Sequence, residues 1–521
     1  MSIVLGLDSS TQSLSAVILN TESGVILADD SVNFGNDLPH FEQPHGYDES
    51  GAHGEVHANP LMWLEALDLL LSKMKANGVD FSKVEAVSGS GQQHGSVYLR
   101  SCFGEKLAGL DSSSDLANQL AGCLSRQSSP IWMDSSTTEE CEEIAVAVGG
   151  NDVVCAKSGS VAVERFTGPQ IRKFAKTAPS DYAETGIIHL VSSFFASIMA
   201  GKNVAIDHGD GAGMNLMNLA EKDWDAKLVK VTADDLLGKL PPCAPSSTKS
   251  GVISSYFVEK YGFSPTCETI IWSGDNPCSL IGMGAAAPGK VVISLGTSDT
   301  LFAAMPEPRT DPNGYGHVFG NPAGGYMSLI CFKNGSLARE AVKDRFNLEW
   351  SAFEKEGLSK TPIGNGGLMM LPFYEPEITP VLNTGGPVFS EEGGSSPEQW
   401  VRAVLEGQFL NMRVHSNWLG VKPERIYLTG GASENDGIAQ VIANVFGVPV
   451  GRLDVPGSAT IGAGMRAAHG IGIELRDLES KFSEPTEGRT IDPESGTKEI
   501  YDEIVEDFRE FLERQQAIET I

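Results

Sequence analysis

Asp8 is the first residue of the chain whose type and position could do chemistry. It follows the apolar run Ile3–Leu7, which has the character of a buried strand, and precedes a turn of small hydroxyl residues, Ser9–Thr11. A carboxylate at a strand end beside bare N–H groups suits a phosphate and its metal ion. Aspartate and serine are also ordinary in hairpin turns, so this stretch alone leaves both interpretations open.

A second stretch with the same plan occurs far downstream. Val291–Ala304 reads as a strand, a turn that contains Gly296, Thr297, Ser298 and Asp299, and another strand. Two such strand–turn–strand segments, each opening one half of the chain, predict a duplicated architecture that holds a nucleotide between its halves.

Asp275 is the carboxylate best placed for acid–base chemistry. It follows an apolar strand, Ile270–Trp272, and sits in a glycine turn beside Asn276. Such a setting could hold a general base at the floor of a cleft. A turn-stabilising aspartate is the alternative, and on spacing alone it is the more common case.

Three further side chains are candidates for ligand contacts. His94 lies in the glycine-rich loop Gly89–Gly95, Arg165 stands beside a Gly-Pro turn, and Trp350 could stack on a base. Each has a plainer interpretation. A lone histidine in such a loop is more often a local hydrogen-bonding residue, an arginine beside a turn can be a surface charge, and a tryptophan belongs more often to the core.

The segments around these residues alternate between strand and helix patterns. Val84–Ser88 reads as a strand that runs into the His94 loop, and Ile426–Ala432 reads as a strand that ends in a double glycine before a helix over Glu434–Phe446. This order is typical of α/β folds, whose ligands sit at the carboxyl ends of strands. The second glycine turn is a further candidate for a nucleotide contact.

Capping residues mark several helix starts. Asn59 followed by proline begins one helix, Thr137 or Ser136 caps another with an acidic first turn, and Ser396 opens a third. The acidic segment Lys498–Arg514 is expected to form a solvated amphipathic helix.

The length predicts two domains. A chain of 521 residues exceeds what one compact core usually holds. Small residues, proline and glycine cluster in Gly282–Lys290, so we expect an N-terminal domain over 1–283 and a C-terminal domain over 284–521.

Charge and composition exclude several classes of protein. The formal net charge of -30 argues against a nucleic-acid partner, which needs a basic face. An acidic protein that binds an anion such as ATP must use backbone amides, helix N-termini and magnesium. No apolar run is long enough for a membrane span, and no signal peptide opens the chain, so we expect no membrane association and a cytoplasmic protein. The eight cysteines form no C-x-x-C pair, and free thiols are expected.

Several familiar motifs are missing. The chain has no G-x-x-x-x-G-K-[ST], no H-E-x-x-H and no G-x-S-x-G. G-x-G-x-x-A occurs at Gly282–Ala287 and Gly462–Ala467. The first runs into Pro288 instead of a helix, and the second is interpreted as small residues on a helix-packing face, so neither is taken as a dinucleotide site.

Considered together and in order, these segments resemble the FGGY carbohydrate kinases, and among them the eukaryotic-type xylulokinase branch most. The similarity runs from the DSSTQ turn to Gly457–Gly470. Many bacterial xylulokinases carry methionine where this chain has Gln93, which favours the eukaryotic type. The motifs that carry the resemblance are SGSGQQHGSVY, PIWMDSSTTEEC, ERFTGPQI, DGAGMNLM, SGDNPCSLIGMG, ISLGTSDTLF, CFKNGSLARE and LTGGASEN.

The resemblance implies an actin-like α/β fold with two domains of the ribonuclease H type. ATP and magnesium would bind in the cleft between the domains, with the sugar, D-xylulose, deeper on the N-terminal side. It also implies that Asp275 is the catalytic base, which accepts the proton of the C5 hydroxyl as that oxygen attacks the γ-phosphate. His94, Arg165 and Asn276 would bind the sugar, and Asp8 would position magnesium.

The remaining contacts implied by the resemblance concern the nucleotide. The phosphate groups would be bound by Thr11, Gln12, Gly296, Thr297 and Ser298, and the adenosine part by Trp350, Gly430, Gly431 and Asn435. The oligomeric state, monomer or homodimer, stays open.

Two other functions remain at this stage. A kinase of the same family with another substrate, such as ribulose or glycerol, would keep the fold, because a few hydrogen bonds set sugar preference. A non-kinase actin-like ATPase or chaperone would share the two phosphate turns. It would have no use for His94, Arg165, Asp275 and Asn276 together.

Overall fold

The computed structural model describes residues 2–51, 53–352, 358–391, 394, 396–453, 457–485 and 488–519. The chain forms two compact units. The first unit is Met1–Ala286 with Val318–Met327 and Val455–Ser483, and the second is Ala287–His317, Ser328–Asp454 and Glu484–Ile521. The sequence suggests a single boundary at 283/284, whereas the first division follows Ala286 and two later segments return to the first unit.

A mixed sheet forms the centre of the first unit, with the order β13-β14-β5-β1-β2-β3 and with β15 paired to β5. The strands β1, β2 and β3 form an antiparallel meander, and β5 runs parallel to β1. The strands of this sheet are β1 (Ile3–Ser9), β2 (Ser13–Asn20), β3 (Val25–Asn33), β5 (Val84–Gly91), β13 (Lys249–Val252), β14 (Glu268–Ile270) and β15 (Ser273–Gly274).

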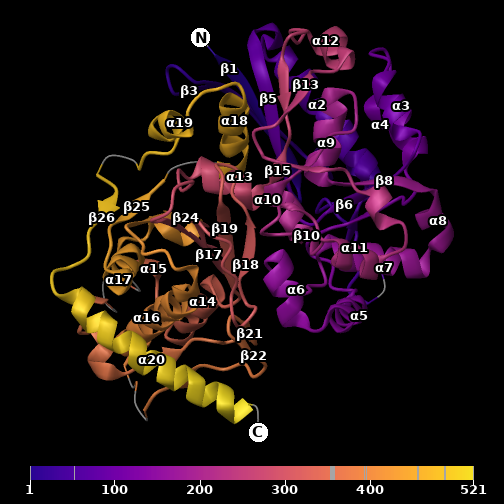
Figure 1. Ribbon diagram of the computed structural model, residues 1–521. Coiled ribbons are helices and arrows are strands. Elements are labelled where there is room, and N and C mark those ends of the chain that lie inside the picture. Colours follow the sequence, from indigo (N-terminus) through magenta and orange to yellow (C-terminus); the bar gives the residue numbers. More distant parts are fainter. Residues whose placement is uncertain are drawn as a thin grey trace. The chain divides into compact units, whose positions relative to one another are not determined.

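Helices cover both faces of this sheet, as the alternation along β1 requires. Leu5 and Leu7 pack into a core with α2 (Pro60–Ala76) and α9 (Val191–Ala200). Val4 packs on the opposite face against Ile461 and Met465 of α18 (Ser458–Gly470). Beside α18 lie α13 (Asp275–Gly282) and α19 (Leu475–Phe482) (Figure 1).

Shorter elements complete the first unit. The strands β6 (Ser96–Arg100) and β8 (Thr185–Leu190) pair antiparallel after the His94 loop. Two-residue strands are β4 (His57–Ala58), β7 (Ser129–Pro130), β9 (Ile206–Asp207), β10 (Met217–Asn218), β11 (Asp223–Trp224) and β12 (Cys243–Ala244). The remaining helices are α1 (Phe34–Asp37), α3 (Phe103–Ala108), α4 (Leu116–Leu120), α5 (Thr138–Val148), α6 (Asn151–Ser158), α7 (Thr167–Thr177), α8 (Pro179–Glu184), α10 (His208–Gly211), α11 (Ala226–Thr232) and α12 (Ser255–Tyr261).

The second sheet repeats this plan. Its order is β18-β19-β17-β16-β24-β25-β26, in which β16 pairs antiparallel with β17 and parallel with β24. The same relation joins β1 to β2 and β5, so the duplication predicted from the two turns is present. The strands are β16 (Lys290–Leu295), β17 (Asp299–Met305), β18 (His317–Gly320), β19 (Tyr326–Phe332), β24 (Arg425–Thr429), β25 (Val450–Arg452) and β26 (Thr490–Ile491).

The helices of the second unit pack on one another as well as on the sheet. The C-terminal helix α20 (Thr497–Glu519) lies against α16 (Pro397–His415) and α17 (Asp436–Phe446), and α14 (Ser336–Arg345) packs on α16 (Figure 1). The other elements are α15 (Trp350–Ala352), β20 (Met370–Leu371), β21 (Glu377–Ile378), β22 (Val381–Leu382) and β23 (Val388–Phe389).

The predicted helix starts hold with one exception. Asn59 and Ser396 accept hydrogen bonds from Leu61 and Gln399 N–H, as N-caps do. Thr137 precedes α5, but its hydroxyl donates to the carbonyl of Glu164 instead of capping the helix. The tail forms an amphipathic helix, and Tyr501, Phe508 and Phe511 give it a buried face in addition to its solvated one.

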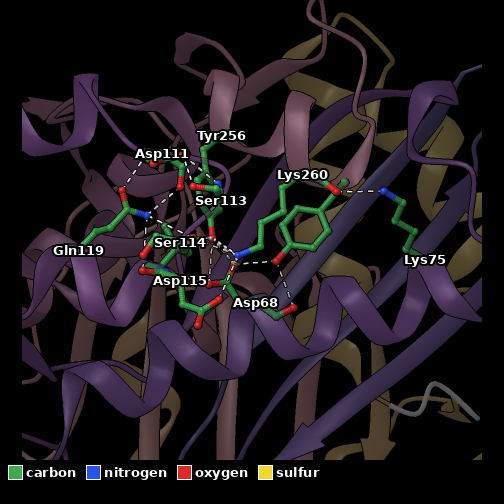
Figure 2. Close-up of polar contacts among 11 residues, drawn as sticks. Asp68, Lys75, Asp111, Ser113, Ser114, Asp115, Gln119, Tyr256 and Lys260 are labelled. Carbon is green, nitrogen blue, oxygen red and sulfur yellow. Dashed lines mark hydrogen bonds and ion pairs between the residues drawn. The ribbon is translucent and has the colours of Figure 1, made fainter.

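A buried carboxylate ties three helices of the first unit together. Asp68 on α2 accepts hydrogen bonds from the hydroxyls of Tyr256 at 2.7 Å and Tyr261 at 2.6 Å and from the N–H of Leu116 at 2.8 Å. Figure 2 shows Tyr256 and Lys260 of α12 directed toward Asp68, and Lys260 lies 3.5 Å from it. These bonds connect α2, α4 and α12.

Within the described ranges, none of the helices combines the length and the apolar character that a bilayer span requires.

Candidate functional site

Three parallel strand ends of the first unit meet at one edge of its sheet. Asp8 of β1 is opposite Ser90 of β5, and Ser90 is opposite Ser273 of β15. The His94 loop follows β5 and helix α13 follows β15. Sheets of α/β proteins bind ligands at the carboxyl ends of parallel strands. Asp8, His94 and Asp275 therefore lie at the edge of the sheet where a ligand is expected.

Asp8 is buried at this edge. Its Oδ1 is among the buried polar atoms for which no hydrogen-bond partner is found in the described part of the chain. Burial raises the pKa of the Asp8 carboxyl to about 7, the neighbouring hydroxyl of Ser90 opposes this rise, and the charge of Asp275 adds to it. A cation placed here would stabilise the ionised carboxylate.

Asp275 is the first residue of α13 and is partly exposed. Its Oδ1 accepts hydrogen bonds from the backbone N–H of Asn276 at 2.8 Å and from the Asn276 side-chain amide at 3.0 Å. Burial raises the pKa of Asp275 to about 6, against hydrogen bonds from Asn276 and Gln93 that lower it. A carboxylate with a pKa close to neutrality can accept a proton from a hydroxyl group.

Gln93 links this carboxylate to the His94 loop. Its Oε1 accepts a hydrogen bond from Asn276 Nδ2 at 2.8 Å. Its Nε2 is buried, and no hydrogen-bond partner is found for it within the described ranges. Both N–H donors of this amide nitrogen are therefore left to offer to a ligand or to water.

Buried polar atoms without a partner gather along this strand edge. In native proteins such atoms are normally satisfied by protein, water or ligand, so a group of them indicates a polar binding site. Among the described residues, those of the edge are Asp8 Oδ1, Ser9 Oγ, Ser90 Oγ, both amide atoms of Gln92, Gln93 Nε2 and Ser273 Oγ.

His94 is held as a neutral hydrogen-bond acceptor. Its backbone has φ 71°, and its Nδ1 lies 2.9 Å from the carbonyl oxygen of Gly213, to which it donates. Burial and the charge of Arg165 lower the pKa of the imidazole to about 3. The neutral ring stacks on Phe166 with centroids 4.2 Å apart, and its Nε2 is left as an acceptor.

Arg165 is brought to the same place by Phe166. Its guanidinium carbon lies 5.6 Å from the centroid of the Phe166 ring, on which His94 also stacks. A cation and a neutral acceptor thus share one aromatic support, an arrangement suited to a polyhydroxylated ligand with a carbonyl group.

The turn after β1 has an aromatic neighbour that sequence reasoning did not single out. Trp132 is 45% exposed, and its indole N–H donates to Thr11 Oγ1 at 2.9 Å. Gln12 is exposed next to this pair. Trp132 was visible in the PIWMDSS motif, but nothing in its spacing indicated contact with Thr11.

The second unit has a cavity of about 580 Å³ at the ends of β16 and β24. These strands are parallel, and Ser294 is opposite Thr429. Gly430 has φ 89°, and a Cβ there would lie 2.3 Å from the carbonyl oxygen of Leu295, so only glycine fits. The volume is in the range of sites for small molecules and cofactors.

Most of the predicted nucleotide contacts line this cavity. Gly296, Thr297, Trp350, Gly431 and Asn435 do so, whereas Ser298 and Gly430 lie next to it in sequence without forming its wall. Asn435 is the N-cap of α17 and accepts a hydrogen bond from the N–H of Ile438 at 2.9 Å.

Trp350 does not belong to the core. It is 44% exposed, with the ammonium group of Lys343 5.6 Å from its ring centroid. The structure adds Arg339 to the cavity wall, a residue that sequence reasoning left aside because nothing linked it to the turn in the linear sequence.

Both sheets place polar residues at the carboxyl ends of parallel strands, where α/β folds bind ligands. The model of the FGGY carbohydrate kinase C-terminal domain matches residues 291–471, and that of the N-terminal domain matches residues 127–282. The chain is 44% identical to xylulose kinase 2 of Arabidopsis thaliana over 90% of this chain and 87% of that protein. It is 41% identical to xylulose kinase of Rattus norvegicus over 98% of this chain and 96% of that protein.

The chain therefore belongs to the FGGY family of carbohydrate kinases. The fold agrees. The xylulose kinase structure from Rhodospirillum rubrum superposes with a TM-score of 0.84 over 100% of both chains at 19% identity. A Plasmodium falciparum glycerol kinase structure with ADP gives 0.79 over 99% of this chain and 98% of that one at 14% identity.

The family and the fold resolve two expectations. The actin-like α/β fold in two domains is confirmed. The chain is a sugar kinase, and the hypothesis of a non-kinase ATPase or chaperone is not supported.

Proposed function

We propose that this kinase transfers the γ-phosphoryl group of ATP to the C5 hydroxyl of D-xylulose and forms D-xylulose 5-phosphate. The observation that carries the proposal is the polar cluster of the first unit, in which the Asp275 carboxylate, the Gln93–Asn276 pair and the neutral His94 occupy one strand edge. The identity with proteins named xylulose kinase over nearly the whole chain supports the choice of sugar.

Asp275 acts as the general base. Its carboxylate takes the proton of the hydroxyl group while that oxygen forms a bond to the γ-phosphorus, and the bond from that phosphorus to the β,γ-bridging oxygen breaks as ADP leaves. The raised pKa of Asp275 keeps it a usable proton acceptor at neutral pH.

Three residues orient the sugar. The Nε2 of His94 accepts a hydrogen bond from a hydroxyl, Arg165 donates to the carbonyl or a hydroxyl, and Asn276 completes the contacts. Because His94 is neutral and its Nδ1 is committed to Gly213, it can accept but not donate at Nε2. This asymmetry favours a ligand with a hydroxyl at that point.

ATP binds to the second unit. The turn of Gly296, Thr297 and Ser298 holds phosphate groups, and Trp350, Gly430, Gly431 and Asn435 hold the adenosine part. Thr11 and Gln12 are proposed as further phosphate contacts. Exposed Thr297, the glycine turn at Gly430 and Gly431 and the N-terminus of α17, which begins at Asp436, support this assignment. We assign sugar binding and the base to the N-terminal domain and nucleotide binding to the C-terminal domain.

The residues present fit a magnesium ion. Mg²⁺ usually takes one or two carboxylates and completes its shell with phosphates and water. Asp8, whose buried Oδ1 has no partner in the described part of the chain, would supply such a ligand. No group of three or more His, Cys, Asp or Glu side chains suited to a metal occurs in the described ranges, which agrees with an ion that arrives with the nucleotide. When bound, the ion would offset charge on the transferred phosphoryl group.

We further propose a cytoplasmic enzyme that acts as a monomer or homodimer on its small-molecule substrate, with no nucleic-acid partner. The net charge of -30 disfavours polyanions and keeps the protein soluble.

A coupled ADP-release assay tests the proposal. The purified protein with magnesium and ATP is measured without sugar and then with D-xylulose, L-xylulose, D-ribulose, glycerol and gluconate. We expect strong stimulation by D-xylulose alone. Stimulation by another sugar would change the proposed substrate and leave the proposed mechanism in place. A rate of ADP release that no sugar changes would contradict the proposed function.

A further inference from the structure

The phosphate turn of the second unit lies on a buried ion pair that the contacts assigned above do not use. Arg339 of α14 and Asp299 of β17 have side chains exposed to 0% and 1%. The guanidinium donates from Nη1 to Asp299 Oδ2 at 2.8 Å and from Nη2 to Oδ1 at 3.0 Å. This is a bidentate ion pair buried from solvent, and its two parallel hydrogen bonds fix the relative orientation of the guanidinium and carboxylate groups.

We propose that Asp299 and Arg339 form a clamp that positions the Gly296–Ser298 turn and so sets the affinity for the phosphate groups of the nucleotide. The proposal rests on the proposed function, because it takes the cavity beside the turn as the nucleotide site.

The clamp holds both polar backbone groups of Gly296. The N–H of Gly296 donates to Asp299 Oδ1 at 3.1 Å. Its carbonyl oxygen accepts from Arg339 Nη2 at 3.4 Å and from the N–H of Ser336 at 2.8 Å. With both groups fixed, the peptide plane at the start of the turn cannot rotate without breaking these bonds. The fixed peptide plane of Gly296 therefore sets the path of the backbone through the exposed residues that follow, Thr297 and Ser298.

The start of α14 packs directly on the turn. A Cβ at Gly335 would lie 2.6 Å from Asp299 Oδ1 and 2.7 Å from the carbonyl oxygen of Thr297. Because Gly335 has no side chain, the backbone at the start of α14 can contact the turn. Arg339 lies one helical turn further along α14, and its guanidinium group is thereby held next to the Asp299 carboxylate.

A second layer fixes the guanidinium. Gln408 of α16 accepts a hydrogen bond from Arg339 Nη1 at 3.2 Å. Its amide nitrogen donates to the carbonyl oxygens of Asn334 at 2.6 Å and Gly335 at 2.8 Å. The clamp is thus supported from α16 as well as from α14, and it needs no rearrangement when a ligand binds. Preorganised donors of this kind raise affinity because the cost of ordering them is met during folding.

Arg339→Lys tests the clamp, because lysine keeps the charge but cannot form the bidentate pair. Isothermal titration calorimetry measures the Kd of ADP with magnesium and the Kd of adenosine. We expect the ADP Kd to rise at least about tenfold, as for the loss of one hydrogen bond to a charged group, and the adenosine Kd to stay within about twofold. A merely structural role would weaken both ligands alike.

Arg402→Lys is the matched control. Arg402 forms a buried ion pair with Glu406 at 3.0 Å on α16, in the same unit. Among the described residues, its hydrogen bonds go to Thr361, Glu406 and Leu358 and not to the turn. We expect this variant to bind ADP as the wild type does. Equal loss of ADP and adenosine affinity in Arg339→Lys, or no loss of either, would overturn the clamp. A wild-type protein that bound neither ligand would overturn the nucleotide site and the clamp together.

Hydrogen exchange of the ligand-free protein tests the clamp in a second way. It can be measured even if a variant is less stable than the wild type. Asp299→Asn and Arg339→Lys are expected to speed amide exchange in a peptide over 296–299, with α16 peptides unchanged. Exchange at wild-type rates in that peptide would overturn the proposal even if binding were lost.

Discussion

At the scale of single residues, environment separates groups that the sequence shows as equivalent. Asp8 and Asp275 are both aspartates at the end of a strand. Asp8 is buried, and its Oδ1 finds no partner among the described residues, whereas Asp275 accepts two hydrogen bonds from Asn276 and is partly exposed. The first setting suits a cation and the second suits a proton acceptor, so two similar carboxylates are proposed for different tasks.

Asp275→Asn tests the proposed base. Asparagine keeps an oxygen for the hydrogen bonds from Asn276 but cannot take up the proton. We expect kcat to fall by roughly 10²–10⁴-fold, the usual contribution of general base catalysis, with the Kd of ADP nearly unchanged. The measurement is steady-state kinetics with D-xylulose, followed by calorimetry with ADP. An equal loss of ADP affinity would instead make Asp275 a structural or metal-site residue.

His189 gives the first unit a pH-dependent stability. The ring is fully buried beside Ser193 and Asn203, and burial lowers its pKa to about 4. Unfolding restores the ordinary pKa of about 6.5, so between these values the unfolded chain binds more protons. Stability from this group is complete above the unfolded pKa and is lost as the pH falls toward the folded one.

The change from pH 7 to pH 5 should therefore cost the wild type about 2 kcal/mol more than His189→Gln. Native-state hydrogen exchange of β8 amides measures this difference, and the other titrating groups cancel between the two proteins. The same pH dependence in both proteins would show that His189 is not held neutral.

At the scale of elements, close helix contact decides where helix α13 lies. A Cβ at Gly462 of α18 would lie 1.9 Å from the carbonyl oxygen of Cys278 on α13, and one at Gly282 would lie 1.9 Å from that of Ser458. The helices thus meet backbone to backbone. The interpretation of Gly462–Ala467 as a helix-packing face is confirmed. Since α13 begins at Asp275, this contact also places the carboxylate.

Gly462→Ala should destabilise the first unit, because a backbone carbonyl cannot move aside as a side chain can. We expect a loss of about 1–3 kcal/mol or more, seen as a lower Tm in calorimetry. Gly238→Ala is the control, since its Cβ would meet no heavy atom within 4 Å. Equal melting of both variants and the wild type would contradict the close contact.

At the scale of the whole molecule, the two units are not two consecutive pieces of chain. Residues 455–483 belong to the first unit although they lie in sequence between two segments of the second, Ser328–Asp454 and Glu484–Ile521. There, Ile461 and Met465 of α18 cover Val4, Leu19 and Ala86 of the first sheet. The expected boundary at 283/284 could not include this return, because no local pattern in α18 tells which sheet it will cover.

A chain truncated at Ala286 should therefore fail to form a native first unit. Loss of α18 and α19 exposes the apolar face that they cover, and we expect a poorly soluble protein without near-UV circular dichroism. Joining residues 455–483 to it through a flexible linker should restore solubility and signal. A soluble, native-like chain ending at Ala286 would contradict this assignment.

The sequence by itself determined the local features of this kinase. The strand–turn–strand segments at Asp8 and Gly296, the caps at Asn59 and Ser396 and the glycine turn at Gly430 depend on neighbouring residues, and each occurs where its pattern indicates. The order of the motifs along the chain indicated the family and the residue roles that the family implies. The spacing of single residues did not indicate them.

Only the tertiary structure decided which of these features meet. The pairs Gln93–Asn276, Thr11–Trp132 and Asp299–Arg339 join residues far apart in the chain. Thr137 bonds to Glu164 instead of capping its helix for the same reason. Such contacts, and the pKa shifts of Asp8, Asp275 and His94, depend on burial and on partners brought from other elements. Burial is a property of the packed molecule, so no window of the sequence contains it.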